Sequence, residues 1–185
     1  MPERWRALLL AAWCGLRFGE IAALRKHRLD LDVGTVLVTE AANNLQNGTR
    51  ITGPPKTEAG RRTVAIPPHI IPALKHHVET FSADGPTGLV FVGSKGAPIN
   101  GSRFHASVWE PAKASVKGLP ERLVLHDLRA WSATKTAQHG ATVRELQARL
   151  GHTTPAMALK YQRAEAIRDH ALAAKMSEGF ERSGT

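Results

Sequence analysis

The stretch RLGHTTPAMALKYQRA, residues 149–164, predicts a corner between two helices. Gly151 stands where the first helix ends, because glycine readily adopts the left-handed backbone conformation that closes many helices. The Thr-Pro pair at 154–155 is typical of a new helix, with threonine as the cap and proline at the first position. His152 therefore lies in the connection, and Tyr161, the single tyrosine of the chain, lies in the second helix. A histidine and a phenol thus come from two elements that meet at a corner.

Helical patterns also cover much of the remaining chain. Apolar residues at helical spacing run over 5–27, where a break is expected at Gly15 or Gly19. A second amphipathic helix is predicted over 68–81. Further helices are predicted from 126 to about 176, separated by Gly140, Gly151 and Pro155, and followed by a loose tail.

One more helix is predicted between these two groups. It spans 100–116, with Asn100 or Ser102 as its cap and Pro111 limiting one end. The apolar run 88–93 before it predicts a short buried extended segment.

The strand signals are confined to residues 35–67. Strands are predicted over 35–40, 49–52 and 61–67, and the Asn-Gly pair at 47–48 is a strong hairpin-turn signal. The three strands would form one small antiparallel sheet. The predicted fold class is therefore α+β and mostly helical: a helical bundle with a small three-stranded antiparallel sheet.

The composition is that of one basic globular domain. The 185 residues include 25 Lys and Arg against 16 Asp and Glu, which gives a net charge of +9 and a pI near 10.3. A surface this basic attracts polyanions, among which nucleic acid is the most common in a cell. Ribosomal and membrane-surface proteins can be equally basic, so charge alone leaves the partner open.

The N-terminal segment resembles a signal peptide only superficially. The apolar run ALLLAAWCGL, residues 7–16, is followed at once by Arg17 and Glu20, and it is too short to cross a bilayer. Cys14 is the single cysteine, so an intrachain disulfide is excluded. We therefore expect a cytoplasmic protein that does not associate with a membrane.

Several charged residues stand in contexts that also have ordinary explanations. Arg17 and Glu20 have the spacing of a common helix ion pair. His126 and Arg129 project from one side of a helical turn, where an arginine usually reaches solvent. Lys56 stands beside a tight turn, where a lysine usually protects a sheet edge. Taken singly, none of these residues indicates catalysis.

Taken together, they resemble the catalytic domain of the tyrosine recombinases, the phage integrase family. GLRFGEIAAL (15–24) resembles the family's first-arginine box, and PKTEAGRRTVAIP (55–67) its hairpin lysine box. HDLR (126–129) matches the second-arginine box, and LGHTTPAMALKY (150–161) matches the final box. The four boxes occur in the family's order and the resemblance runs from about residue 5 to 165.

The resemblance implies that two arginines bind the phosphate of DNA. Arg17 and Arg129 would bind the non-bridging oxygens of the scissile phosphate, and His152 would donate a further hydrogen bond. Glu20 would support Arg17. These donors would act most strongly where negative charge develops in the transition state.

The same resemblance assigns the covalent chemistry. Tyr161 would attack phosphorus and form a 3′-phosphotyrosine link. Lys56 would protonate the departing 5′-hydroxyl, and His126 would help deprotonate the tyrosine. Such a reaction conserves the energy of the broken bond, so neither ATP, a metal ion nor another cofactor is expected.

The resemblance also implies a domain arrangement and partners. Residues 1–185 would form a single catalytic domain, with 166–185 as a C-terminal helix and tail that is exchanged between subunits in relatives. Family members usually carry N-terminal core-binding and arm-binding domains, and neither is expected within these 185 residues. The expected partner is double-stranded DNA, bound by a homotetramer that is a monomer or weak oligomer without DNA. Accessory DNA-bending or directionality proteins and a nucleoid-associated location are further expectations.

Two alternatives remain at this point. A type IB topoisomerase has a similar fold and chemistry but relaxes supercoils instead of exchanging strands. A non-catalytic DNA-binding remnant would keep the basic surface and form no covalent link with DNA.

Overall fold

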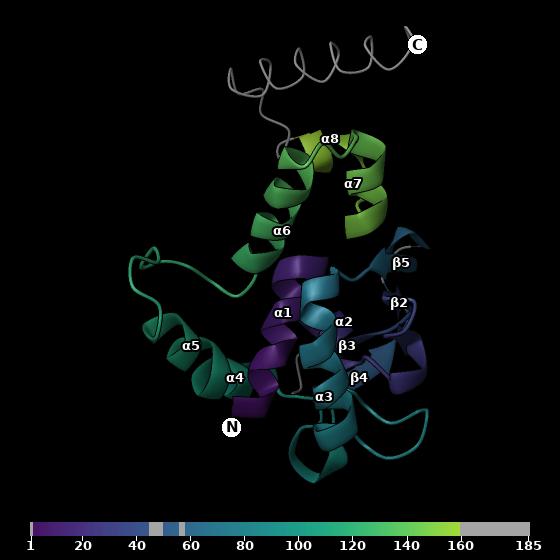
Figure 1. Ribbon diagram of the computed structural model, residues 1–185, viewed down its shortest axis with the longest axis vertical. Helices are drawn as coiled ribbons and strands as arrows, with labels where there is room; N and C mark the ends of the chain where they lie inside the picture. Colours follow the sequence, from purple (N-terminus) through teal and green to yellow (C-terminus); the bar gives the residue numbers. More distant parts are fainter. Residues whose placement is uncertain (1, 45–49, 56–57, 160–185) are drawn as a thin grey trace, which may run out of the picture.

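The computed structural model describes residues 2–44, 50–55 and 58–159. Figure 1 shows one group of helices above a second group that lies against short strands. The α-helices are α1 (Arg6–Cys14), α2 (Phe18–Ala22), α3 (Ile71–Phe81), α4 (Gly101–Phe104), α5 (Glu110–Ala114), α6 (Asp127–Gln138), α7 (Val143–Leu150) and α8 (Pro155–Leu159). Short 3-10 turns are η1 (Pro2–Trp5), η2 (Lys26–Arg28), η3 (Glu58–Gly60), η4 (Pro68–Ile70) and η5 (Ser94–Gly96).

The predicted break in the first helix is confirmed at Gly15. This residue follows α1 with φ 66° and ψ 23°, a left-handed conformation that glycine adopts without strain. A Cβ atom at Gly15 would lie 2.7 Å from Leu150 Cδ2, so the turn also fits closely against α7. Gly19 lies inside α2, where its missing side chain lets the helix approach the backbone of Ala42.

The strands form two sheets instead of the single predicted one. β1 (Leu29–Asp30), β2 (Thr35–Val38) and β5 (Arg62–Ala65) form a three-stranded antiparallel sheet in the order β1-β2-β5. β3 (Ala41–Asn44) and β4 (Arg50–Gly53) form a separate antiparallel pair.

The sequence therefore predicted the size of the larger sheet but not all of its members. The strand predicted at 49–52 pairs with β3, whose sequence AANN lacks the β-branched residues that signal a strand. β1 has only two residues, too few for an alternating pattern. The Asn-Gly pair at 47–48 lies outside the described residues.

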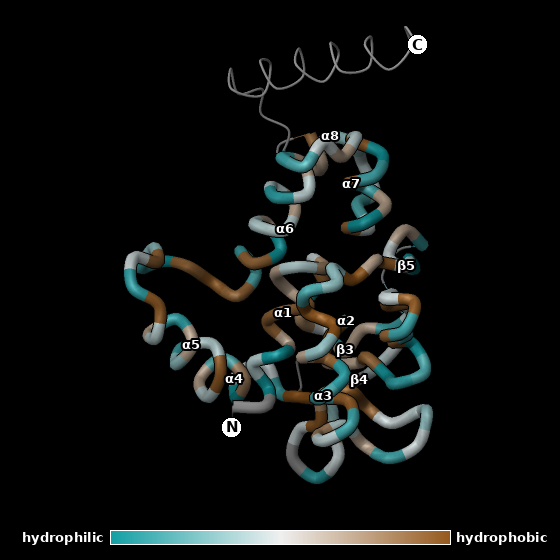
Figure 2. The backbone as a smooth tube through the Cα atoms, viewed as in Figure 1, coloured by the Kyte–Doolittle hydropathy of each residue, from teal (hydrophilic) through white to brown (hydrophobic). Residues whose placement is uncertain are grey.

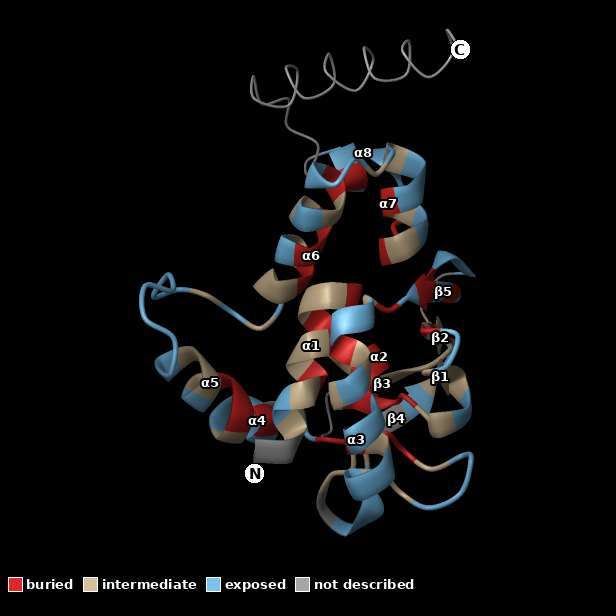
Figure 3. Ribbon diagram, in the orientation of Figure 1, coloured by how far each residue is buried: buried red, intermediate tan, exposed pale blue. Residues whose placement is uncertain are grey.

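The core is formed where α1 and α2 meet the larger sheet. Leu10 of α1, Val36 of β2, Val64 of β5 and Phe91 of the predicted extended segment are fully buried in one cluster. Figure 2 shows the hydrophobic stretches of α1 and α2, and Figure 3 shows that buried residues line their inner sides. A smaller cluster joins the upper helices, and its buried members are Ala133, Ala137, Leu146, Leu150 and Ala158.

The helix predicted over 100–116 is present with one difference. Asn100 caps it as predicted, because its Oδ1 accepts a hydrogen bond from the Arg103 backbone N–H at 3.0 Å. Pro111 does not limit the helix, which continues to the end of α5. A π-helical turn (η6, His105–Trp109) ends two residues before the proline and gives the helix a wider turn close to the residue that lacks a backbone donor.

The helices after residue 126 follow the predicted breaks. α6 ends before Gly140, α7 ends before Gly151 and α8 begins at Pro155. Thr142 caps α7, with its Oγ1 accepting from the Glu145 backbone N–H at 3.2 Å and the Glu145 carboxylate accepting from the Thr142 backbone N–H at 2.7 Å. The predicted helix to Met176 and the tail lie outside the described residues, within which no helix is long and apolar enough to span a membrane.

We expect Gly151→Ala to destabilise the protein more than Gly85→Ala. Both glycines have positive φ, 64° and 72°, so an alanine is strained at either position by about 1–2 kcal/mol. A Cβ at Gly151 would also lie 2.7 Å from the Ala59 carbonyl oxygen, whereas one at Gly85 meets nothing within 4 Å. This overpacking should add about 1–3 kcal/mol. Urea unfolding of the two variants measures the difference, and equal losses would contradict the close fit at Gly151.

Candidate active site

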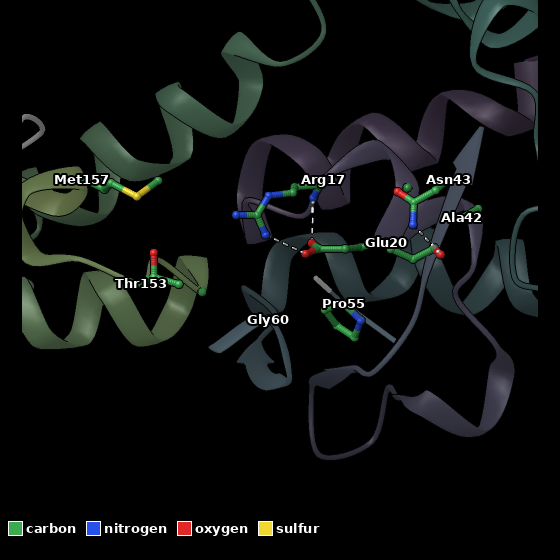
Figure 4. Close-up of a pocket in the computed structure, with 11 residues that line it drawn as sticks. Arg17, Glu20, Ala42, Asn43, Pro55, Gly60, Thr153 and Met157 are labelled. Carbon is green, nitrogen blue, oxygen red and sulfur yellow. Dashed lines mark hydrogen bonds and ion pairs between the residues drawn. The ribbon is translucent and has the colours of Figure 1, made fainter. Parts of the chain in front are cut away.

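Arg17 is the N-cap residue of α2 and is oriented by Glu20, three residues later. The Arg17 backbone N–H donates to Glu20 Oε2 at 2.8 Å, and its guanidinium Nη1 donates to Oε1 at 3.0 Å. The Arg17 side chain is 40% exposed, whereas that of Glu20 is only 3% exposed. Figure 4 shows both contacts at the edge of a cavity. The predicted pair is therefore confirmed, and its guanidinium faces solvent.

A second arginine, Arg62 of β5, binds the same carboxylate through two guanidinium nitrogens. Its Nη1 donates to Glu20 Oε1 at 3.0 Å and its Nη2 donates to Oε2 at 2.9 Å, in a fork with both partners almost fully buried. Sequence reasoning did not single out Arg62. The signal was available, because the alternation of β5 places Arg62 on the same face as the buried Val64.

The two arginines determine the charge state of Glu20. Burial alone would raise the pKa of this carboxyl group. The hydrogen bonds and positive charge of Arg62, together with those of Arg17, outweigh burial and hold the pKa of Glu20 below its ordinary value. Glu20 is therefore a buried, ionised group between two cations.

We expect stability to fall in acid partly through Glu20. Because its pKa is lower in the folded state, its contribution is fully present above the unfolded-state pKa and is lost as the pH falls toward the folded pKa. Urea unfolding of wild type and Glu20→Gln at about pH 7 and about pH 3.5 tests this. The variant should be less stable at neutral pH, by up to about 3 kcal/mol, and should lose less on acidification. Glu121→Gln, at an exposed loop position, is the control and should behave as wild type.

Arg129 of α6 is buried and ties two helix ends together. Its Nη1 donates to the Gly15 carbonyl oxygen after α1, and its Nη2 donates to the Leu150 carbonyl oxygen at the end of α7. The last carbonyl groups of a helix have no partner within the helix and carry its negative dipole end. A guanidinium is well suited to both, so Arg129 fixes the turn before Arg17 and the turn before His152.

Two further arginines strengthen the same junction. Arg62 Nε donates to the Arg149 carbonyl oxygen at 2.8 Å, next to the carbonyl that Arg129 binds. The Arg149 guanidinium donates from Nη2 to the Trp13 carbonyl oxygen of α1 at 2.9 Å. Arg129 and Arg149 thus hold the ends of α1 and α7 together, and Arg62 connects the end of α7 to Glu20 of α2.

The two predicted histidines stand at the edges of this junction. His152 follows Gly151 and is mostly buried, and its backbone N–H donates to the Gln147 carbonyl oxygen at 3.1 Å. His126 directly precedes α6 and is exposed.

Two cavities meet at Arg17. One of about 210 Å³ is lined by Arg17, His126 and Arg129, together with apolar residues of α1, α2 and α4. The other, of about 430 Å³, is the one shown in Figure 4 and is lined by Arg17, Glu20, Gly151 and Thr153, among others. The structure therefore brings Arg17, His126 and Arg129 together around one cavity, and Arg17 also lines the second cavity.

The remaining predicted residues, Lys56 and Tyr161, lie outside the described residues. Pro55, which precedes the lysine, and Met157, four positions before the tyrosine, both line the larger cavity. Within the described part of the chain, no group of three or more His, Cys, Asp and Glu side chains could hold a metal ion.

Comparison with known proteins shows the family of the chain. The sequence pattern that defines the phage integrase family matches residues 3–167, most of the chain. The chain belongs to the phage integrase family. The match covers the four boxes and every residue of the candidate site, including Tyr161.

Relatives within the phage integrase family occur in mycobacteria and their phages. The integrase of Mycobacterium phage D29 is 39% identical over 180 residues, which are 95% of this chain and 47% of that protein. The putative prophage phiRv2 integrase of Mycobacterium tuberculosis, strain CDC 1551, is 37% identical over 181 residues, covering 96% of this chain and 47% of that protein. The chain therefore spans about half the length of these integrases.

The fold is shared with solved tyrosine recombinases. The Tn1549 transposon integrase, solved in complex with transposon right end DNA, has a TM-score of 0.76 at 21% identity, covering 95% of this chain and 59% of that one. The XerA recombinase has a TM-score of 0.68 at 20% identity, covering 94% of this chain and 56% of that one. The fold predicted from the sequence is thus confirmed as that of a tyrosine recombinase catalytic domain.

Proposed function

We propose that this chain cuts and rejoins DNA strands at specific sites through a covalent link between Tyr161 and a 3′-phosphate. The observation that carries the proposal is the shared cavity of Arg17, His126 and Arg129. These side chains come from segments more than 100 positions apart in the sequence, in a chain of the phage integrase family.

In this proposal the two arginines bind the scissile phosphate. Arg129 is anchored by two backbone carbonyls and Arg17 by Glu20, so neither guanidinium has to be ordered when DNA binds. Such preorganised donors act most strongly on the charge that develops on the non-bridging oxygens in the five-coordinate transition state. His152, held after the end of α7, would donate a further hydrogen bond.

The bonds that form and break involve three other groups. The Tyr161 oxygen forms a bond with phosphorus as the bond to the 5′-oxygen breaks. Lys56 gives a proton to that departing oxygen, and His126 helps remove the phenol proton. A phenol has a pKa near 10, so it needs such help to act as a nucleophile at neutral pH. The reverse reaction with another 5′-hydroxyl reseals the strand.

Double-stranded DNA is the partner that fits the charge. The net charge is +9, and the Tn1549 integrase of the same fold was solved with DNA. Family membership makes a homotetramer on DNA the assembly that we propose, with residues 166–185 exchanged between subunits.

DNA affinity should fall steeply with salt. Each phosphate contact releases a condensed counterion. The logarithm of the association constant for DNA should therefore decrease by about 0.9 for each contact with every tenfold rise in salt concentration. Fluorescence anisotropy of a labelled duplex over a salt series measures this slope. A flat profile would contradict binding through the basic surface.

A nicked suicide substrate tests the proposed reaction. Cleavage next to the nick releases a short oligonucleotide, so resealing is prevented and the covalent protein–DNA product accumulates. The proposal predicts this product with a duplex that carries a target site, and its transfer to a second duplex with a free 5′-hydroxyl.

The other outcomes separate the alternatives. Relaxation of supercoiled plasmids without strand transfer would favour a type IB topoisomerase, which the match to integrases does not support. DNA binding without any covalent product would favour a non-catalytic remnant.

A further inference from the structure

We propose that Arg62 is a positioning residue for the proposed cleavage, which it serves through Arg17 and the turn before His152. The inference rests on the proposed function. Arg62 would not touch DNA. Its guanidinium would instead keep that of Arg17 turned toward the phosphate and keep the end of α7 in place.

Arg62 is a cation that cannot serve as a DNA contact. Its side chain is 5% exposed, and its donors are directed into the protein. Nη1 and Nη2 bind the two oxygens of Glu20, Nη1 also donates to the Gly60 carbonyl oxygen at 3.1 Å, and Nε donates to the Arg149 carbonyl oxygen at 2.8 Å. One side chain thus joins α2, the turn before β5 and the end of α7.

The fork on Glu20 limits what Arg17 can do. A guanidinium and a carboxylate prefer to pair through two parallel hydrogen bonds. Arg62 already holds Glu20 in this way, so among the described residues Arg17 makes a single guanidinium contact, from Nη1 to Oε1. Its other donors face the cavities that it lines. Without Arg62, we expect Arg17 to form the fork itself and turn away from the phosphate.

The hydrogen bond from Arg62 Nε acts on the other side of the site, at the end of α7. The Arg149 carbonyl that Arg62 binds lies in the last turn of α7, just before Gly151 and His152. Removing this donor frees one of the carbonyl groups that fix the corner. A small displacement of groups around a reacting centre can slow a reaction by about 10²-fold even when no contact to substrate is lost.

Arg61 provides a matched control. It is the neighbouring cation, it is exposed, and no hydrogen bond to Glu20 involves it. Arg61→Gln and Arg62→Gln remove the same charge from adjacent positions. If Arg62 served only as positive charge for DNA, the exposed residue would matter at least as much.

The experiment compares these variants in the full chain on the suicide substrate at saturating DNA. We expect Arg62→Gln to lower the single-turnover cleavage rate by about 10- to 100-fold while DNA affinity stays close to wild type. Arg61→Gln should cleave at the wild-type rate. Equal cleavage rates in the two variants, or a loss confined to DNA affinity, would overturn the inference.

A double-mutant cycle tests the path through Arg17. In an Arg17→Ala background, the substitution Arg62→Gln should slow cleavage by a smaller factor than it does alone, because the guanidinium that it positions is already absent. Fully additive effects would show that Arg62 does not act through Arg17.

A conservative variant separates positioning from folding. Arg62→Lys keeps the charge but cannot form the planar fork, so it should fold and bind DNA yet cleave slowly. If Arg62→Gln does not fold, this variant carries the test, with the melting temperature measured alongside. Cleavage by Arg62→Lys at the wild-type rate would show that the fork between Arg62 and Glu20 is not required.

A structural measurement keeps the inference separate from the proposed function. Crystal structures of Arg62→Gln or Arg62→Lys without DNA should show the Arg17 guanidinium bound to Glu20 through two hydrogen bonds instead of the single Nη1 bond of the wild type. The contact between Arg17 and Glu20 can be measured in this way even if the wild-type chain does not cleave DNA. Such a failure to cleave would overturn the proposed function alone. An unchanged Arg17 in both variants would overturn the positioning role.

Discussion

Tyr161→Phe should abolish the covalent protein–DNA product and leave DNA affinity nearly unchanged. The substitution removes a single oxygen, which in the proposed mechanism is the nucleophile. Tyr161 is the single tyrosine of the chain, so no other phenol can replace it. DNA affinity depends mainly on cationic contacts with many phosphates, and these are untouched by the change.

The suicide-substrate assay and a gel-shift assay measure the two effects separately. A slow-migrating covalent band should form with wild type and be absent with Tyr161→Phe, while the two binding curves overlap. A covalent product that persists in the variant would assign the nucleophile to another residue. A collapse of affinity would mean that the phenol binds DNA rather than attacking it.

Arg17→Ala and Arg129→Ala should each lower the cleavage rate by about 10²–10³, the loss expected for one preorganised donor to a developing charge. Their effects on stability should differ. The exposed Arg17 contacts Glu20, which Arg62 still holds after the substitution, so the folded state should be little changed. Arg17→Ala is therefore the cleaner test of phosphate binding.

Arg129→Ala should also destabilise the protein. It removes the donor to the buried carbonyl groups of Gly15 and Leu150, at a cost of about 2–6 kcal/mol for two unsatisfied acceptors. Urea unfolding and single-turnover cleavage of both variants, with Arg61→Gln as the control, measure stability and rate together. Equal destabilisation by the two alanine substitutions would contradict the anchoring role of Arg129.

Local features were predictable because neighbouring residues determine them. Gly15 follows α1 where a break was predicted at Gly15 or Gly19, and Gly151 follows α7 in the left-handed conformation that its position predicted. Asn100 caps its helix, and Arg17 meets Glu20 at the spacing of one turn. Each of these contacts spans only a few residues, so its geometry follows from the local backbone.

Contacts between distant segments were less predictable. The strand at 50–53 pairs with 41–44 because chain connectivity favours a hairpin, and a pattern of β-branched residues does not reveal that partner. Pro111 remains inside a helix because a π-helical turn accommodates it. The role of Arg62 depends on a partner 42 positions away, and a local pattern can show only that Arg62 faces inward.

The sequence by itself determined the fold class, the family and the order of the candidate residues, because these follow from local periodicity, turn residues and short boxes. The tertiary structure alone decided that Arg129 binds the ends of α1 and α7 and that Arg62 shares Glu20 with Arg17. A buried guanidinium group needs hydrogen-bond acceptors, and here those acceptors come from segments that meet only after the chain has folded.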